Sequence, residues 1–209
     1  MCSILQNIMT MKHLQIFSKY LIYISIIGIP LIWVCALYFD FFYSPQYFLW
    51  QSFISFMYHL SWLALLFVMS IRPLSQIFPK IRILKQMIFL RKTFWILSAS
   101  IIVSNLVWWM FTRPDFFLSY VSLAKWEIGY ALLARISEIT AVILLVTSNN
   151  YSIKKLKKNW KRVQYLAYPY FISWGLVAAQ FEPIWYYGTM GTVASLYIIV
   201  IAKKMFSPQ

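Results

Sequence analysis

The sequence predicts an all-α integral membrane protein, a bundle of six transmembrane helices whose two termini both lie on the cytoplasmic side. Composition is the first reason: 62% of the 209 residues are hydrophobic and 11% are charged, whereas soluble domains carry about 25% charged residues. The second reason is that apolar runs of about 20 residues recur, the length that spans a hydrocarbon core of about 30 Å. The third is that basic residues collect in alternate connections between these runs.

The first span is expected over residues 20–39, which hold no charged side chain. This run is longer than the hydrophobic region of a typical signal peptide and lacks a small-residue cleavage site, so we expect it to stay in the protein. Pro30 is expected to kink it, because proline lacks the N–H that closes the helical turn. The preceding residues 1–19, with Lys12 and Lys19, are expected to form a cytoplasmic tail or an interfacial helix.

The second span is expected over residues 47–71, with His59 near its middle. Pro73 is expected to end this helix, because it cannot donate the next backbone hydrogen bond. Residues 72–92 combine six basic residues with Ile, Leu, Met and Phe. That mixture favours an amphipathic segment lying on the membrane surface. The third span is then expected over residues 93–112.

The second half of the chain supplies three more spans. Residues 113–127 form a partly apolar connection, which we expect at the membrane interface. The fourth and fifth spans, residues 128–148 and 163–181, enclose a short basic loop. The sixth span covers residues 183–202 and is followed by a basic cytoplasmic tail, residues 203–209.

The distribution of charge orients these six spans, residues 20–202, which form one transmembrane domain because no repeat or linker divides them. Sixteen of the 19 Lys and Arg residues lie in the two tails and in the connections after the second and fourth spans. The acidic residues outside the spans all fall on the other side, namely Asp40, Asp115, Glu127 and Glu182. By the positive-inside rule both termini are cytoplasmic, and we expect the protein in a bacterial inner membrane.

The composition and motifs also exclude several classes of function. The net charge of +14 would suggest nucleic-acid binding in a soluble protein. Here the aromatic residues lie in the apolar runs, so we expect membrane lipids and no nucleic acid as partners. Cys2 and Cys35 are isolated and form no disulfide framework, and no metal site is predicted. The chain has no Walker loop, GxGxxG, HExxH or GxSxG motif, which argues against the common soluble enzymes.

A spaced pattern extends from the end of the fourth span into the fifth: Thr147, Ser148, Leu156, Trp160, Val163 and Tyr168. Two shorter patterns lie earlier in the chain, Arg72-Pro73-Leu74 and Arg91-Lys92. Together they resemble the ferric reductase-like transmembrane domain family, in particular the haem-binding membrane subunit of bacterial periplasmic methionine sulfoxide reductase systems. The resemblance covers roughly residues 52–202, with Lys157 in place of a family glycine. It implies a bundle of transmembrane helices.

In that family histidines hold a b-type haem, and the resemblance places the three ligand positions on Asn105, Gln164 and Val177. None of these is histidine, and neither an amide nor valine is a good axial ligand for haem iron. The resemblance therefore implies the fold without the haem, and no cofactor is expected. The alternative is a b-type haem held through substituted ligands, of which His59 could supply one.

Three residues inside the spans are the remaining candidates for function. His59 is the one histidine within a span, and a neutral imidazole bonded to a neighbouring helix is the structural alternative to a haem or metal role. Arg135 and Glu138 lie three residues apart on the fourth span, so they can form an ion pair on one helix face. The pair could serve a proton path, an ion site or a partner contact, or it could lock the fourth span against polar residues of the third.

These observations leave three classes of function, in order of preference. The first is a non-catalytic membrane subunit or scaffold that binds a periplasmic or membrane protein partner. The second is a haem-binding electron-transfer subunit of an oxidoreductase, which would need a separate partner because no loop is large enough for a flavin or nucleotide site. The third is a small transporter that uses Arg135 and Glu138. Catalysis by the chain alone is not predicted.

Overall fold

The computed structural model describes five stretches of the chain, residues 2–42, 47–112, 129–148, 150–180 and 182–206. Every regular element within them is helical. Four stretches are long and apolar enough to cross a membrane by their length and composition: Met11–Ala36, Ser52–Ile77, Arg82–Thr112 and Pro183–Phe206. The expectation of an all-helical chain with helices of membrane-crossing length is thus confirmed for the described residues. The connection expected over residues 113–127 lies outside them.

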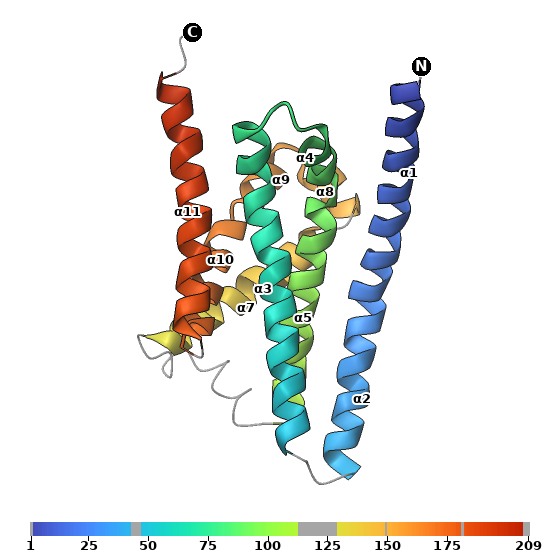
Figure 1. Cartoon of the computed structure of the whole chain (residues 1–209). Coiled ribbons are helices and arrows are strands. Elements are labelled where there is room, and N and C mark those ends of the chain that lie inside the picture. The colour runs from blue at the N-terminus through green and yellow to red at the C-terminus, as the bar shows by residue number, and fades with distance from the viewer. Residues whose placement is uncertain (1, 43–46, 113–128, 149, 181, 207–209) are drawn as a thin grey trace.

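The first of these stretches lies in one long helical rod of three elements: α1 (Cys2–Tyr23), η1 (Ile24–Gly28) and α2 (Ile29–Phe42) (Figure 1). Residues 2–19, expected as a tail or an interfacial helix, continue directly into the apolar run. The middle element, η1, is a π-helical turn, in which the Ile29 N–H donates to the Ile24 carbonyl. It comes just before Pro30, whose missing N–H weakens the regular ladder of backbone hydrogen bonds. A kink is expected at Pro30, and the irregularity that the structure shows there is this π-helical turn.

The second stretch belongs to α3 (Tyr47–Ile77), a helix that continues through Pro73. The expectation that Pro73 ends this helix is therefore wrong. Pro73 is fully buried, and packing holds the helix together across the missing backbone hydrogen bond. Close to the break, the Nε of Arg91 donates to the Val68 carbonyl at 3.1 Å. Because the helix extends further than expected, His59 lies a few residues before the middle of α3.

α4 (Arg82–Met87) and η2 (Ile88–Leu90) follow α3 and lead into α5 (Arg91–Thr112). The helix expected over residues 93–112 is therefore confirmed. The basic segment expected to lie before it, residues 72–92, is divided among several elements. Its first residues extend α3, residues 82–90 form two short helices, and Arg91 and Lys92 begin α5.

The remaining helices are α7 (Tyr130–Thr147), α8 (Asn150–Leu156), α9 (Lys158–Gln164), α10 (Ala167–Ala178) and α11 (Pro183–Phe206). α7 and α11 agree with the helices expected for the fourth and sixth spans. The fifth expected span, residues 163–181, is not one continuous helix, because the chain turns at residues 165–166. α10 has 12 residues, which corresponds to a length of about 18 Å. A new helix can begin there because Pro169 lies in the first turn, where a backbone N–H would have no helical partner.

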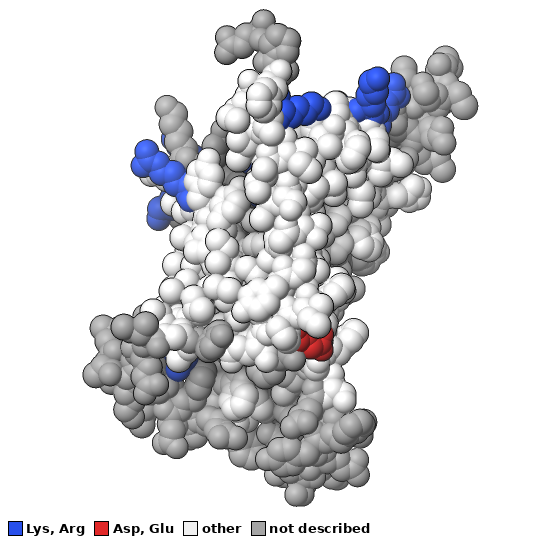
Figure 2. Space-filling model, turned by 60° about the vertical axis from the view of Figure 1, so that its left-hand side comes forward, with Lys and Arg blue, Asp and Glu red and all other residues white. Residues whose placement is uncertain are grey.

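Figure 1 shows that the first residues of α1 and the last residues of α11 lie at the same end of the bundle, together with α4, α8 and α9. α3 packs most extensively against α5, and α10 against α7. Most Lys and Arg side chains visible in Figure 2 gather at the end with the chain termini. We call this the basic end. The other end, where α3 and α11 begin, is called the opposite end.

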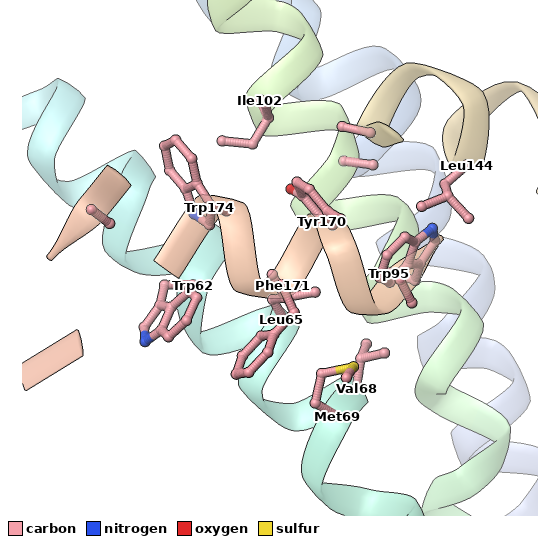
Figure 3. Packing of buried hydrophobic residues seen from close by; sticks show 14 of the residues in the cluster. Trp62, Leu65, Val68, Met69, Trp95, Ile102, Leu144, Tyr170, Phe171 and Trp174 are labelled. Atoms are coloured by element: carbon pink, nitrogen blue, oxygen red, sulfur yellow. The ribbon is translucent and has the colours of Figure 1, made fainter. Parts of the chain in front are cut away.

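The main hydrophobic core lies between α3, α5, α7, α10 and α11 (Figure 3). Aromatic rings fill much of it. The rings of Trp62 and Phe171 stack with their centroids 5.0 Å apart, and Trp95 meets Tyr170 edge-on. Gly175 permits this packing, because a Cβ atom there would lie 2.7 Å from the Trp62 ring.

A chain of hydroxyl groups crosses the same core. Ser61 and Ser98 lie with their hydroxyl oxygens 3.0 Å apart, and Ser98 lies 3.0 Å from the hydroxyl of Tyr170. These three residues come from α3, α5 and α10, so the chain of hydrogen bonds ties three helices together. Hydrogen bonds between small polar side chains are a usual way for helices to associate in lipid.

The outer helices expose large apolar side chains. Examples on the rod and on α11 are Ile27, Leu31, Val34, Ile184, Ile198 and Ile201. An apolar surface of this kind suits a hydrocarbon environment, whereas soluble monomers rarely expose large apolar patches. The surface of the described residues therefore agrees with the membrane-crossing length of these helices.

Candidate functional site

A cavity of about 540 Å³ lies among five helices on the side of the bundle toward the opposite end. Its walls come from α3, α5, α7, α10 and the beginning of α11, and they are mostly apolar and aromatic. The polar residues that line it are few: Ser55, Tyr58, His59, Asn105, Glu138, Glu182 and Tyr186. Binding sites for small molecules usually have this size, roughly 300–1,000 Å³, and this mixture of apolar walls and a few polar groups.

His59 and Glu182 form one polar pair of the cavity. The Nδ1 of His59 lies 2.8 Å from the Ser55 carbonyl oxygen, which can only accept, so Nδ1 carries a proton. The Nε2 of His59 lies 3.1 Å from Oε2 of Glu182. A neutral imidazole and an ionised carboxylate would place two acceptors face to face. This contact therefore needs a further proton, on Nε2 or on the carboxyl group.

Two residues that line the cavity, Asn105 and Trp174, each contain a buried polar atom that has no hydrogen-bond partner among the described residues. Asn105 is 5% exposed and donates from Nδ2 to the Tyr58 hydroxyl at 2.7 Å, but its Oδ1 has no partner. The indole Nε1 of Trp174 is also buried without one. Each such atom costs about 1–3 kcal/mol.

Arg135 and Glu138 form a charged pair on α7, as their spacing predicts. Nη1 of Arg135 and Oε2 of Glu138 are 3.7 Å apart, which suits an ion pair but is too long for a hydrogen bond. The two side chains are 12% and 13% exposed. Glu138 itself lines the cavity. The pair therefore places a carboxylate in the cavity wall, with its counter-charge one helical turn away.

The structure brings together four of the residues singled out from the sequence, because His59, Asn105, Glu138 and Val177 all line this cavity. Arg135 adjoins it through the ion pair. Gln164 does not take part. It lies at the end of α9 and lines a separate hollow at the basic end.

These positions do not fit a haem with two axial ligands. The resemblance assigns the ligands to Asn105, Gln164 and Val177, which offer no imidazole and do not share one cavity. His59 is the one imidazole on the cavity wall, and its Nε2 faces Glu182. Among the residues that the structure describes, no group of three His, Cys, Asp or Glu side chains comes together as a metal site.

Three cavity residues, Tyr58, Trp174 and Glu182, are not predicted by the sequence. Glu182 is expected on a loop. Its contact with His59 joins residues 123 positions apart in the sequence, so no local sequence pattern predicts this contact. Tyr58 leaves a weak signal, because it lies four residues after Ile54 and shares a helix face with it. Trp174 is one of several aromatic residues in an apolar run, and nothing in the sequence distinguishes it from the others.

Comparison with known proteins adds no relative: no family model, no curated protein and no solved structure matches this chain. The resemblance to the ferric reductase-like family therefore rests on the sequence pattern alone. The function proposed for the cavity is therefore inferred from its shape and its lining residues.

Proposed function

We propose that the chain is a bacterial inner-membrane protein that crosses the membrane six times, with both termini in the cytoplasm. The main support is that sixteen of the 19 Lys and Arg residues belong to segments of the basic end, as the positive-inside rule requires. The two shorter crossings are made by α7 and α10. Seven of the 12 residues of α10 are buried, so other helices surround much of this short crossing.

Reporter fusions test this topology. Fusions after Asn150 and after Ser207 should give the signal of a cytoplasmic reporter and none from a periplasmic one. Fusions after Phe42 and after Phe116 should give the reverse pattern, because these points follow an odd number of crossings. A periplasmic signal from the fusion after Asn150 would contradict the six-span arrangement.

We propose further that the chain is a non-catalytic membrane subunit that holds a small, largely apolar molecule in the cavity. On this proposal it has the helical bundle of the ferric reductase-like family that it resembles, but not the haem. One observation carries the proposal: the cavity of about 540 Å³ has mostly apolar walls with a few polar groups, which is the size and composition of sites that hold small organic molecules.

Filling the cavity tests the proposal. Val177 lines the cavity from α10, so Val177→Trp should place an indole ring in the space that the ligand needs. Small molecules released on denaturation of the purified full-length protein are measured by mass spectrometry. The wild-type protein should release one organic molecule per chain. Val177→Trp should release about tenfold less, which requires a loss of more than about 1.4 kcal/mol of binding free energy because the wild-type site is filled.

The matched control is Ile172→Trp on the same helix, at a side chain that is half exposed and does not line the cavity. It adds the same ring without filling the site, so it should release as much as the wild-type protein. Absence of any bound molecule in the wild-type protein would contradict the proposal. Equal release from Val177→Trp would show that the molecule binds elsewhere.

A further inference from the structure

Two hollows at the basic end remain without a role. The first, of about 220 Å³, lies between α3, α5, α7 and the segment around α9. Arg91, Lys92, Ser148 and Gln164 supply polar groups, and the other walls are mostly apolar. This combination of two cations with apolar walls does not resemble the cavity at the opposite end, which contains carboxylates.

The second hollow, of about 340 Å³, lies between α1 and α5. Lys19 lines it from α1, and Lys92 lines it from α5. Phe89 and Lys92 line both hollows, so the two spaces are neighbours separated by these side chains. Lys92 therefore stands between them, with Arg91 on one side and Lys19 on the other.

The walls of both hollows are held in place by buried contacts. The Nε of Arg91 donates to the Val68 carbonyl at 3.1 Å, which fixes the side chain beside the first hollow. The hydroxyls of Ser18 and Thr93 lie 2.6 Å apart and join α1 to α5 beside the second. Thr93 is 1% exposed. The two basic spaces are thus part of the packed structure and not a loose surface.

The electrostatics of this end favour an anion. All five acidic residues of the chain lie elsewhere in the sequence, outside the segments that build the basic end: Asp40, Asp115, Glu127, Glu138 and Glu182. Sixteen basic residues belong to these segments. Clusters of Lys and Arg at the cytoplasmic end of membrane helices attract anionic lipid, each contributing about 1 kcal/mol.

We propose that the two hollows together bind one anionic phospholipid with two phosphate groups, a diphosphatidylglycerol. One phosphate lies between Arg91 and Lys92 and the other between Lys92 and Lys19. The lipid is favoured over a soluble diphosphate because apolar side chains such as Ile22, Ile88 and Phe89 line the same hollows and can contact the upper part of acyl chains. This site depends on the membrane location of the chain but not on a ligand in the other cavity.

Lipid binding to the purified full-length protein in detergent, measured by native mass spectrometry, tests the site. The probes are diphosphatidylglycerol, phosphatidylglycerol with one phosphate, zwitterionic phosphatidylcholine and inorganic phosphate. Diphosphatidylglycerol should bind tightest. Lys92→Gln should weaken it about fivefold or more, the effect of losing about 1 kcal/mol per basic residue. Lys19→Gln should reduce the preference for diphosphatidylglycerol over phosphatidylglycerol, because it removes one side of the second phosphate site.

Lys204→Gln is the matched control, since Lys204 lies at the same end in the last turn of α11 but lines neither hollow. It should leave lipid binding unchanged. An equal loss in Lys204→Gln and Lys92→Gln would overturn the proposal in favour of diffuse attraction. Equal affinity for the two anionic lipids would overturn the two-phosphate site. Displacement of the lipid by inorganic phosphate at the same concentration would show that the hollows bind a soluble anion. Lys19 is exposed, so Lys19→Gln remains informative even if Lys92→Gln fails to fold.

Discussion

Removing either charge of the Arg135–Glu138 pair is expected to lower the free energy of unfolding by about 3–5 kcal/mol. The two side chains are 12% and 13% exposed, so loss of one partner leaves the other charge where neither water nor lipid solvates it well. Arg135→Leu leaves a carboxylate in the cavity wall. Glu138→Gln leaves a guanidinium group beside it.

The double variant Arg135→Leu/Glu138→Gln should recover much of this loss, because no unpaired charge remains. The measurement is unfolding of the purified protein in detergent for the wild type, the two single variants and the double variant, which together give the coupling energy. Lys204→Gln, a surface charge change at the basic end, should stay within about 0.5 kcal/mol of the wild type. If the double variant is as unstable as the less stable of the two single variants, the ion pair does not account for the loss of stability.

Much of the helical order is predictable from the sequence, because long apolar runs bounded by charged residues have few other solutions in lipid. The run over residues 93–112 corresponds to α5, and the runs over residues 128–148 and 183–202 correspond to α7 and α11. The ion pair within α7 is also predictable, since residues three apart on a helix face each other. These features depend on local spacing alone.

The predicted helix ends are wrong near two prolines, where packing against other helices decides whether a helix continues or ends. Pro73 has the sequence signature of a helix end, yet α3 continues because Pro73 is buried and Arg91 donates to a carbonyl near the break. Pro169 has the same signature inside an apolar run, yet a new helix starts just before it. Local sequence shows that proline disturbs a helix, but only the neighbouring helices decide whether the chain continues or turns.

The cavity is predictable only in part. The sequence singles out His59 and Glu138 because ionisable residues within apolar runs are rare, and both do line the cavity. Asn105 and Val177 are singled out only by the family resemblance, and the fold places both in the walls of this cavity. The contact between His59 and Glu182 could not be predicted, since it depends on how α11 begins beside α3.

The expected absence of haem is the second prediction with a large effect. The full-length protein, produced with ample haem, should purify without stoichiometric b-type haem. The positions of the family ligands are Asn105, Gln164 and Val177, and Gln164 lies at a different hollow from the other two. His59 could supply one axial bond at most, and its Nε2 is 3.1 Å from Glu182. The wall of the cavity, as far as the structure describes it, offers no second imidazole.

The absorption spectrum of the purified protein, oxidised and dithionite-reduced, tests most directly that the cavity is not a haem site. A folded, monodisperse protein should show no Soret band relative to its absorbance in the ultraviolet. His59→Ala should then leave the spectrum unchanged. Near-equimolar haem with reduced α and β bands, lost in His59→Ala, would contradict the proposal and make the chain a haem-binding electron-transfer subunit.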